Sequence, residues 1–189
     1  MRIIVAAIVG GLIVFLWGAV AHMATPLGEM GLSTLQDEAH YNLASVPQSG
    51  MYFFPGMDMS KNATPEERKA WEEKVKAGPS GLLIVNKGNG GMTPQRLINE
   101  VLSNIAAALV AAILVSLMVG GYLKRASAVA LFGLFGVISI LFSYWNWYGF
   151  PTAFICAETV MEVVGWFLAG LAIAKIVRPP FVSIVPTVG

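Results

Sequence analysis

The chain contains four long apolar stretches and one long segment of mixed polarity. The apolar stretches cover residues 3–23, 98–123, 126–145 and 152–177. Each can cross a hydrocarbon core of about 30 Å, which takes about 20 helical residues. Because lipid offers no partner for backbone N–H and C=O groups, we expect all four to be α-helices. The pattern predicts an all-α membrane protein, a four-transmembrane-helix bundle.

The segment 24–97 is too long for a plain connection and predicts a small α+β lobe between the first two spans. Thr64 is a suitable helix cap, Pro65 suits a first turn, and Gly78 with Pro79 would end that helix. Short apolar runs bounded by Gly and Pro are typical of brief buried strands, and we expect the two runs here to pair. The expected elements are helices over 33–44 and 65–77 and strands over 51–54 and 82–85.

Basic residues near the span ends indicate the direction of the chain in the membrane. Five of them fall on one side without an acidic neighbour: Arg2, Lys124, Arg125, Lys175 and Arg178. Lys124 and Arg125 are expected in the short turn between spans 2 and 3. The positive-inside bias then places both termini in the cytoplasm and the lobe 24–97 outside the cell. We expect a multi-pass protein of a bacterial inner (cytoplasmic) membrane.

Composition supports a lipid bilayer as the main partner and argues against nucleic acid. Only 12% of residues are charged, and the mean hydropathy is +0.69. The net charge of +1 comes from basic residues scattered along the chain, so no patch is expected to bind nucleic acid. The single cysteine, Cys156, excludes an intramolecular disulfide and any Cys-x-x-Cys motif, and we expect it to be a small buried side chain.

Two glutamates inside the fourth span need a physical explanation. Glu158 and Glu162 are four residues apart, so both carboxylates face the same way. At a rise of 1.5 Å per residue from Pro151, they lie roughly 10 Å and 16 Å below the outer surface. A charge near the bilayer centre costs roughly 3 kcal/mol or more, so neither should face lipid without a partner.

Other spans carry polar side chains that could satisfy these acids. The expected intramembrane polar cluster contains Glu158, Glu162, Glu100, Asn99, Asn104, Ser103 and His22. Three interpretations are open: a structural hydrogen-bonded network, a contact to another subunit or cofactor, and the handling of protons, ions or a metal. No metal site is predicted, because neither histidine has a glutamate at the Glu-x-x-His spacing of di-iron bundles. The sequence shows no recognisable set of a nucleophile, a base and an acid that would indicate a catalytic site.

The stretch YWNWYGFP, residues 144–151, concentrates aromatic rings between spans 3 and 4. Amphipathic rings are enriched at membrane–water interfaces, and Gly149 with Pro151 suits a tight turn into span 4. The alternative is an aromatic pocket for a quinone, pigment, lipid or peptide segment. The residues concerned are Trp17, Tyr144, Trp145, Trp147 and Tyr148. No cofactor is specified, although lipid, quinone and pigment fit such a pocket.

Several short motifs resemble a group of bacterial four-span integral membrane proteins of unknown function. They are FLWGAVAHM, SGMYFFPG, GPSGLLIVNKG, WNWYGFP and GWFLAGLAIAKI, and they are spread over nearly the whole length. The resemblance implies an uncleaved first span and an outer lobe, and it implies no activity.

The preferred hypothesis is a non-catalytic accessory or scaffolding subunit of a larger bacterial membrane complex, photosynthetic or respiratory, with other membrane subunits or a second copy as partners. One alternative is a small transporter or proton-handling protein that uses Glu158 and Glu162. A second alternative is a membrane enzyme that acts on a lipid or quinone, which would need a bound cofactor or metal.

Overall fold

The computed structural model describes residues 1–34, 43–56, 63–88 and 90–180, and within these ranges four helical segments are long and apolar enough to cross a membrane. They are α1 (Arg2–Ala24), α3 (Pro94–Leu117), the continuous α4, η4 and α5 (Tyr122–Gly136, Val137–Leu141 and Phe142–Tyr148), and α6 (Thr152–Ile176). The short elements between α1 and α3 are η1 (Pro26–Glu29), η3 (Leu43–Ser45), β1 (Gly50–Phe54), α2 (Pro65–Ala77) and β2 (Gly81–Val85). The prediction of a mostly helical, multi-pass membrane protein with a small strand pair is confirmed.

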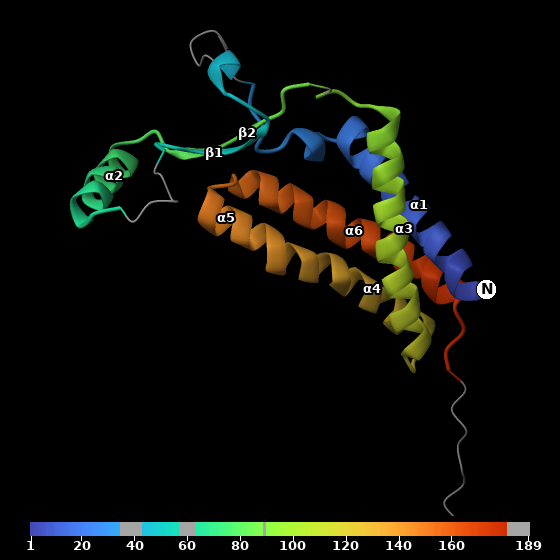
Figure 1. Ribbon diagram of the computed structural model, residues 1–189. Helices are drawn as coiled ribbons and strands as arrows, with labels where there is room; N and C mark the ends of the chain where they lie inside the picture. Colours follow the sequence, from blue (N-terminus) through green and yellow to red (C-terminus); the bar gives the residue numbers. More distant parts are fainter. Residues whose placement is uncertain (35–42, 57–62, 89, 181–189) are drawn as a thin grey trace, which may run out of the picture.

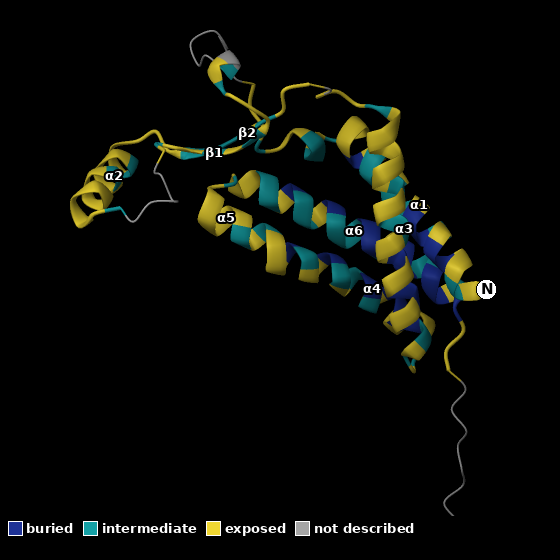
Figure 2. Cartoon of the chain, in the orientation of Figure 1, coloured by how far each residue is buried: buried dark blue, intermediate teal, exposed yellow. Residues whose placement is uncertain are grey.

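Helix α6 has the most extensive packing of the four long helices (Figure 1). It packs along α4 on one side and along α1 on another, while α1 also packs along α3. The shared core is rich in small side chains, including Ala108, Ala112 and Ala169, which let helix backbones approach closely. The outward faces of the helices are exposed and apolar, as suits a surface that meets lipid (Figure 2).

Two glycines mark points where the helices cross without room for a side chain. A Cβ atom at Gly133 of α4 would lie 2.7 Å from the Glu162 carbonyl oxygen on α6. A Cβ atom at Gly11 of α1 would lie 2.5 Å from the Ile105 Cα atom on α3. Gly136, by contrast, has open space around its Cα. Close backbone contact is therefore confined to particular crossing points.

The boundary between the second and third spans differs from the expected one. Helix α3 ends at Leu117, and Met118–Gly121 forms the turn, so the expected single span 98–123 is wrong. Gly120 adopts φ +148°, a conformation that L side chains rarely adopt, and Gly121 caps α4. Lys124 and Arg125 consequently lie in the first turn of α4 and not in the connection.

The strand pair of the lobe is antiparallel, with Met51 opposite Ile84 and Phe53 opposite Leu82. The expected pairing is confirmed, but the expectation of buried strands is wrong, since Phe53 is 57% and Ile84 65% exposed. The reason is that two strands form a single layer, and the described residues place no second layer over this face.

Helix α2 has the expected bounds and the expected start. Thr64 and Glu67 form a capping box, and the Trp71 Nε1–H donates to the Pro55 carbonyl oxygen at 2.9 Å, which ties α2 to the hairpin. Most of the helix expected over 33–44 lies outside the described residues. Cys156 is exposed on α6, which corrects the expectation that it is buried.

Candidate functional site

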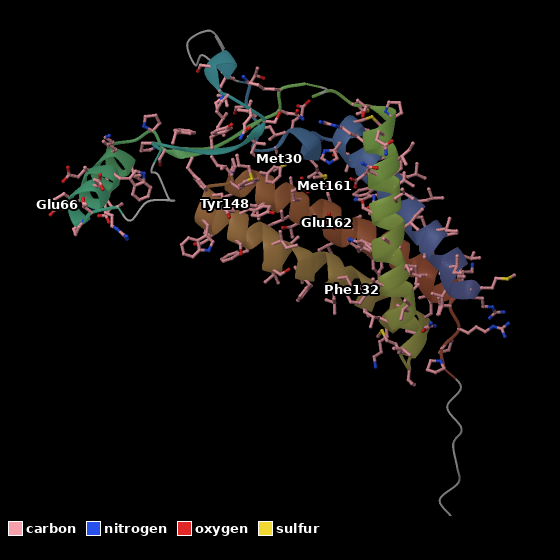
Figure 3. The ribbon with its side chains drawn as sticks, viewed as in Figure 1. Met30, Glu66, Phe132, Tyr148, Met161 and Glu162 are labelled. Carbon is pink, nitrogen blue, oxygen red and sulfur yellow. The ribbon has the colours of Figure 1, made fainter. Side chains whose placement is uncertain are left out.

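Glu162 is anchored by a hydrogen bond within α6. The Trp166 Nε1–H donates to the Glu162 carboxylate at 2.9 Å, and Trp166 is buried in the core. Glu162 is half-buried, on the stretch of α6 that passes beside α3 (Figure 3). Because Gly133 lacks a side chain, the α4 backbone packs directly against this turn. The carboxylate therefore has a fixed donor in Trp166, and the backbone of Glu162 is held against α4.

Glu158 lies one turn nearer the start of α6 and faces the end of α1. Its charge interacts with His22, in the last turn of α1, and with Glu162. Among the described residues Glu158 has no hydrogen-bond partner, although it is half-buried. His22 is exposed, but its backbone is covered on one side, since a Cβ atom at Gly28 of η1 would lie 2.6 Å from the His22 Cα atom. The turn after α1 thus folds back and packs against the histidine.

Glu100 of α3 joins the same group of charges. It interacts electrostatically with Glu162, and its carboxylate accepts a hydrogen bond from the Asn104 Nδ2 at 3.3 Å. Glu162 lies ten residues into α6, or about 15 Å along the helix. Glu100 lies six residues into α3, or about 9 Å along that helix, and it is exposed.

Asn99 and Ser103 are polar neighbours of Glu100 on α3. Both are exposed, and their hydrogen bonds stay within the helix: Asn99 accepts from Gln95 at 2.8 Å, and Ser103 donates to the Glu100 carbonyl oxygen at 2.9 Å. We call Asn99, Glu100 and Ser103 the polar stripe of α3. Of the predicted polar cluster, the structure brings together Glu158, Glu162, Glu100, Asn104 and His22, and it places Asn99 and Ser103 on the outer surface.

Trp17 lies apart from the other aromatic residues singled out in the sequence. Its Nε1–H donates to the Met161 carbonyl oxygen at 2.9 Å, and its ring covers Gly165, where a Cβ atom would lie 2.8 Å from the Trp17 Cδ1 atom. Trp17 is thus a packing contact between α1 and α6.

The aromatic residues around α5 form a ladder that reaches the lobe. Adjacent ring centroids are 5.3–6.1 Å apart, a spacing typical of favourable aromatic pairs. Trp145 donates to the Thr152 hydroxyl at 3.1 Å, whereas Trp147 is 76% exposed. The ladder runs in the order Phe53, Tyr148, Tyr144, Phe150 and Phe154.

A groove of about 380 Å³ lies between the lobe and the end of α5. The hairpin contributes Phe53 and Leu82, α2 contributes Trp71 and Val75, and α5 contributes Trp147 with Tyr148. The lining is aromatic and aliphatic apart from Ser80 and backbone atoms. Such a surface suits an apolar molecule better than a charged one.

Arg125 is the important residue that sequence reasoning missed. It is 2% exposed, and its guanidinium donates to the carbonyl oxygens of Val177 at 2.7 Å, Ala174 at 3.3 Å and Val115 at 3.4 Å. These carbonyls belong to the final turns of α3 and α6 and to the residue after α6, where helices carry unsatisfied acceptors and partial negative charge. The only signal in the sequence is the pair Lys124-Arg125, which is also what an exposed cytoplasmic turn would contain.

The site combines carboxylates, amides and one imidazole, a set of groups that can accept hydrogen bonds from donors or attract cations. Within the described ranges, no group of three or more His, Cys, Asp or Glu side chains is arranged to hold a metal ion. Comparison of the chain with protein-family models, curated proteins and solved structures gives no match.

Proposed function

We propose that the protein is a non-catalytic accessory or scaffolding subunit of a larger bacterial inner-membrane assembly, photosynthetic or respiratory. The observation that carries this proposal is the polar stripe of α3, which is exposed and lies about 8–14 Å along the helix from its start, where Glu100 interacts with Glu162. Polar groups are costly when they face lipid, so a stripe at this depth favours contact with a polar partner. Interhelical hydrogen bonds and small residues are the usual means by which membrane helices associate.

The partner that fits this stripe is a helix of a different subunit, carrying a basic residue or hydrogen-bond donors. Glu158 has His22 as a neighbour, whereas the buried Arg125 lies at the other end of α6. A second copy inserted in the same direction would bring the same acids to the same level. Charge complementarity therefore favours a heteromeric contact over a symmetric one.

The proposed orientation follows the basic residues, with both termini and the Met118–Gly121 turn in the cytoplasm and the lobe outside, over the outer ends of a four-helix bundle. Labelling of cysteines introduced one at a time into a Cys156→Ser chain tests it. A membrane-impermeant maleimide should label Lys69→Cys from outside intact cells and should label Lys124→Cys only after lysis. The reverse pattern would invert the topology.

Extraction in mild detergent followed by native mass spectrometry tests the accessory role. We expect the chain to be recovered with at least one other membrane protein. A solitary monomer, or a complex that contains copies of this chain alone, would contradict the proposal.

A second proposal is that the protein handles protons or cations, and it is favoured by the half-buried, unbonded carboxylate of Glu158 between His22 and Glu162. In that case Glu162→Gln should abolish ion or proton flux into vesicles that contain the protein, while assembly stays intact. Unchanged flux in the variant, or no flux in the unmodified protein, would eliminate this role.

A further inference from the structure

The exposed side of the β1–β2 hairpin is apolar, and its direction can be read from its contacts. Met51, Phe53 and Ile84 share one face, because residues two apart on a strand and residues directly opposite in the register point the same way. All three are more than half exposed. Phe53 contacts Tyr148 with ring centroids 6.1 Å apart, so this face turns toward the end of α5.

The apolar face is continuous with the part of the protein that meets the membrane. The aromatic ladder connects Phe53 through α5 to Phe154 on α6, and the exposed Trp147 stands beside it. Aromatic rings at the end of a membrane span are typical of the interfacial zone. In Figure 1 the hairpin crosses the ends of α5 and α6 and carries α2 beyond them.

Helix α2 has a narrow apolar edge and is otherwise charged. Its two large apolar residues, Trp71 and Val75, are four apart and both line the groove. Its other side chains include four acidic and four basic residues, which remain exposed. An apolar edge against the groove and a charged back toward water is the pattern of an interfacial amphipathic helix.

We propose that the hairpin face of Met51, Phe53 and Ile84, together with Trp147, lies in the outer interfacial zone of the lipid bilayer, and that lipid enters the groove between the hairpin, α2 and α5. The occupant is bilayer lipid because the surface is apolar, carries no charge of its own and continues the lipid-facing end of α5. The lobe is then a membrane-surface element whose α2 turns its charges to water.

Spin labels on single cysteines in the Cys156→Ser chain, reconstituted into phosphatidylcholine vesicles, test this placement. Ile84→Cys and Met51→Cys probe the apolar face, and Lys69→Cys on the exposed side of α2 is the matched control. Power saturation compares access of oxygen, which partitions into lipid, with access of a nickel chelate, which stays in water. The ratio of oxygen to nickel access should be several-fold higher at positions 51 and 84 than at position 69.

Two results would overturn the proposal. Nickel access at position 84 equal to that at position 69 would place the hairpin in water. Low access of both reagents at position 84 would mean that a second copy of the chain covers the face.

Because a cysteine at 84 could disturb the hairpin, quenching of the intrinsic fluorescence by brominated lipid supplies an independent readout. Trp147→Phe should remove a substantial part of that quenching, and equal quenching with and without Trp147 would also count against the proposal.

Discussion

At one end of α6, Arg125 is enclosed by carbonyl oxygens of Val115, Ala174 and Val177, and its charge meets the ends of two helices. Nearer the start of α6, Glu162 interacts with Glu100 of α3, and Glu158 interacts with Glu162 and His22. Trp166 donates to Glu162, and Asn104 donates to Glu100. The first end places one cation among many acceptors. The second places three carboxylates among few donors, and one of the three is exposed.

The two ends differ in how far the described residues satisfy their charged groups, although the Nε of Arg125 is buried without a hydrogen-bond partner among them. The Arg125 end joins α3, α4 and α6 through contacts that all lie within one chain, and the guanidinium is almost fully enclosed. The acidic end retains an exposed carboxylate, Glu100, and a half-buried one, Glu158, that has no hydrogen bond among the described residues. We therefore interpret the Arg125 end as a structural contact that holds the helices together. We interpret the acidic end as the place where a partner molecule binds.

Arg125→Ala should have the largest effect on stability. It leaves three carbonyl acceptors without their donor in a buried position and removes a charge that complements two helix ends, a loss of about 3 kcal/mol or more. Denaturation in mixed detergent micelles measures the change in the free energy of unfolding. Arg125→Lys is the control, because it keeps the charge. Its ammonium group lacks the planar set of donors by which the guanidinium reaches three separate carbonyls, so we expect an intermediate loss of stability. A wild-type transition in Arg125→Ala would show that this structural contact is unimportant.

Replacing a glycine with alanine where α4 crosses α6 should have the next largest effect on the free energy of unfolding. One such glycine lies near the Arg125 end and another near the acidic end, so the two ends can be compared directly. A Cβ atom at Gly170 would lie 2.9 Å from the Val129 Cβ atom near the Arg125 end, and one at Gly133 meets Glu162 and Trp166 near the acidic end. Each substitution should cost about 1–3 kcal/mol, as overpacking usually does. Gly136→Ala is the matched control, because its Cβ atom would meet open space, and it should be neutral or stabilise the helix by up to about 1 kcal/mol. Equal effects at positions 133 and 136 would argue against close α4–α6 packing.

The bond between Trp166 and Glu162 should contribute a smaller amount. Trp166→Phe removes the donor and some core volume, with an expected loss of about 1–2 kcal/mol. Glu162→Gln keeps an acceptor for the indole and should cost less. In a double-mutant cycle, Trp166→Phe with Glu162→Ala should show a coupling free energy of about 1 kcal/mol. Additive effects would mean that the two side chains do not interact in the membrane.

Glu100→Gln combined with Ser103→Ala should have the smallest effect on the isolated chain, within about 0.5 kcal/mol, because both side chains are exposed. The same variant should lose a large part of its co-purifying partner. Leu102→Ala, an exposed apolar position on the same helix, should change neither quantity appreciably. A strong loss of stability in the isolated variant would assign the stripe to the fold of the chain.

Sequence patterns predict local structure here much better than contacts between helices. The helical segments, the Thr64 cap, the strand pair and the Gly149 turn all follow from periodicity or from short-range chemistry. The end of α3 does not, because Met118–Leu123 is apolar enough to continue a span. The helix nevertheless ends where Met118 adopts an extended backbone, two residues before Gly120. The role of Arg125 depends on carbonyls up to 52 residues away, and burial of a strand depends on a second layer that hydropathy does not reveal.

The interactions of the acids show the same limit. Glu158 and Glu162 attract notice in the sequence because intramembrane carboxylates are rare, and their relation to Glu100 and His22 could be expected from depth. Which face of α3 each polar residue occupies could not be expected without knowing which face is buried. Asn104 turns toward the core while Asn99 and Ser103 turn away, and this division creates the polar stripe.

Site-specific photo-crosslinking in native membranes tests the partner contact most directly. A benzophenone amino acid at position 103 lies in the polar stripe of α3, and one at position 102 is the neighbouring exposed apolar position. The account predicts an adduct with another membrane protein from position 103 and little or none from position 102. Adducts with lipid alone at both positions, or the same protein adduct at both, would contradict it.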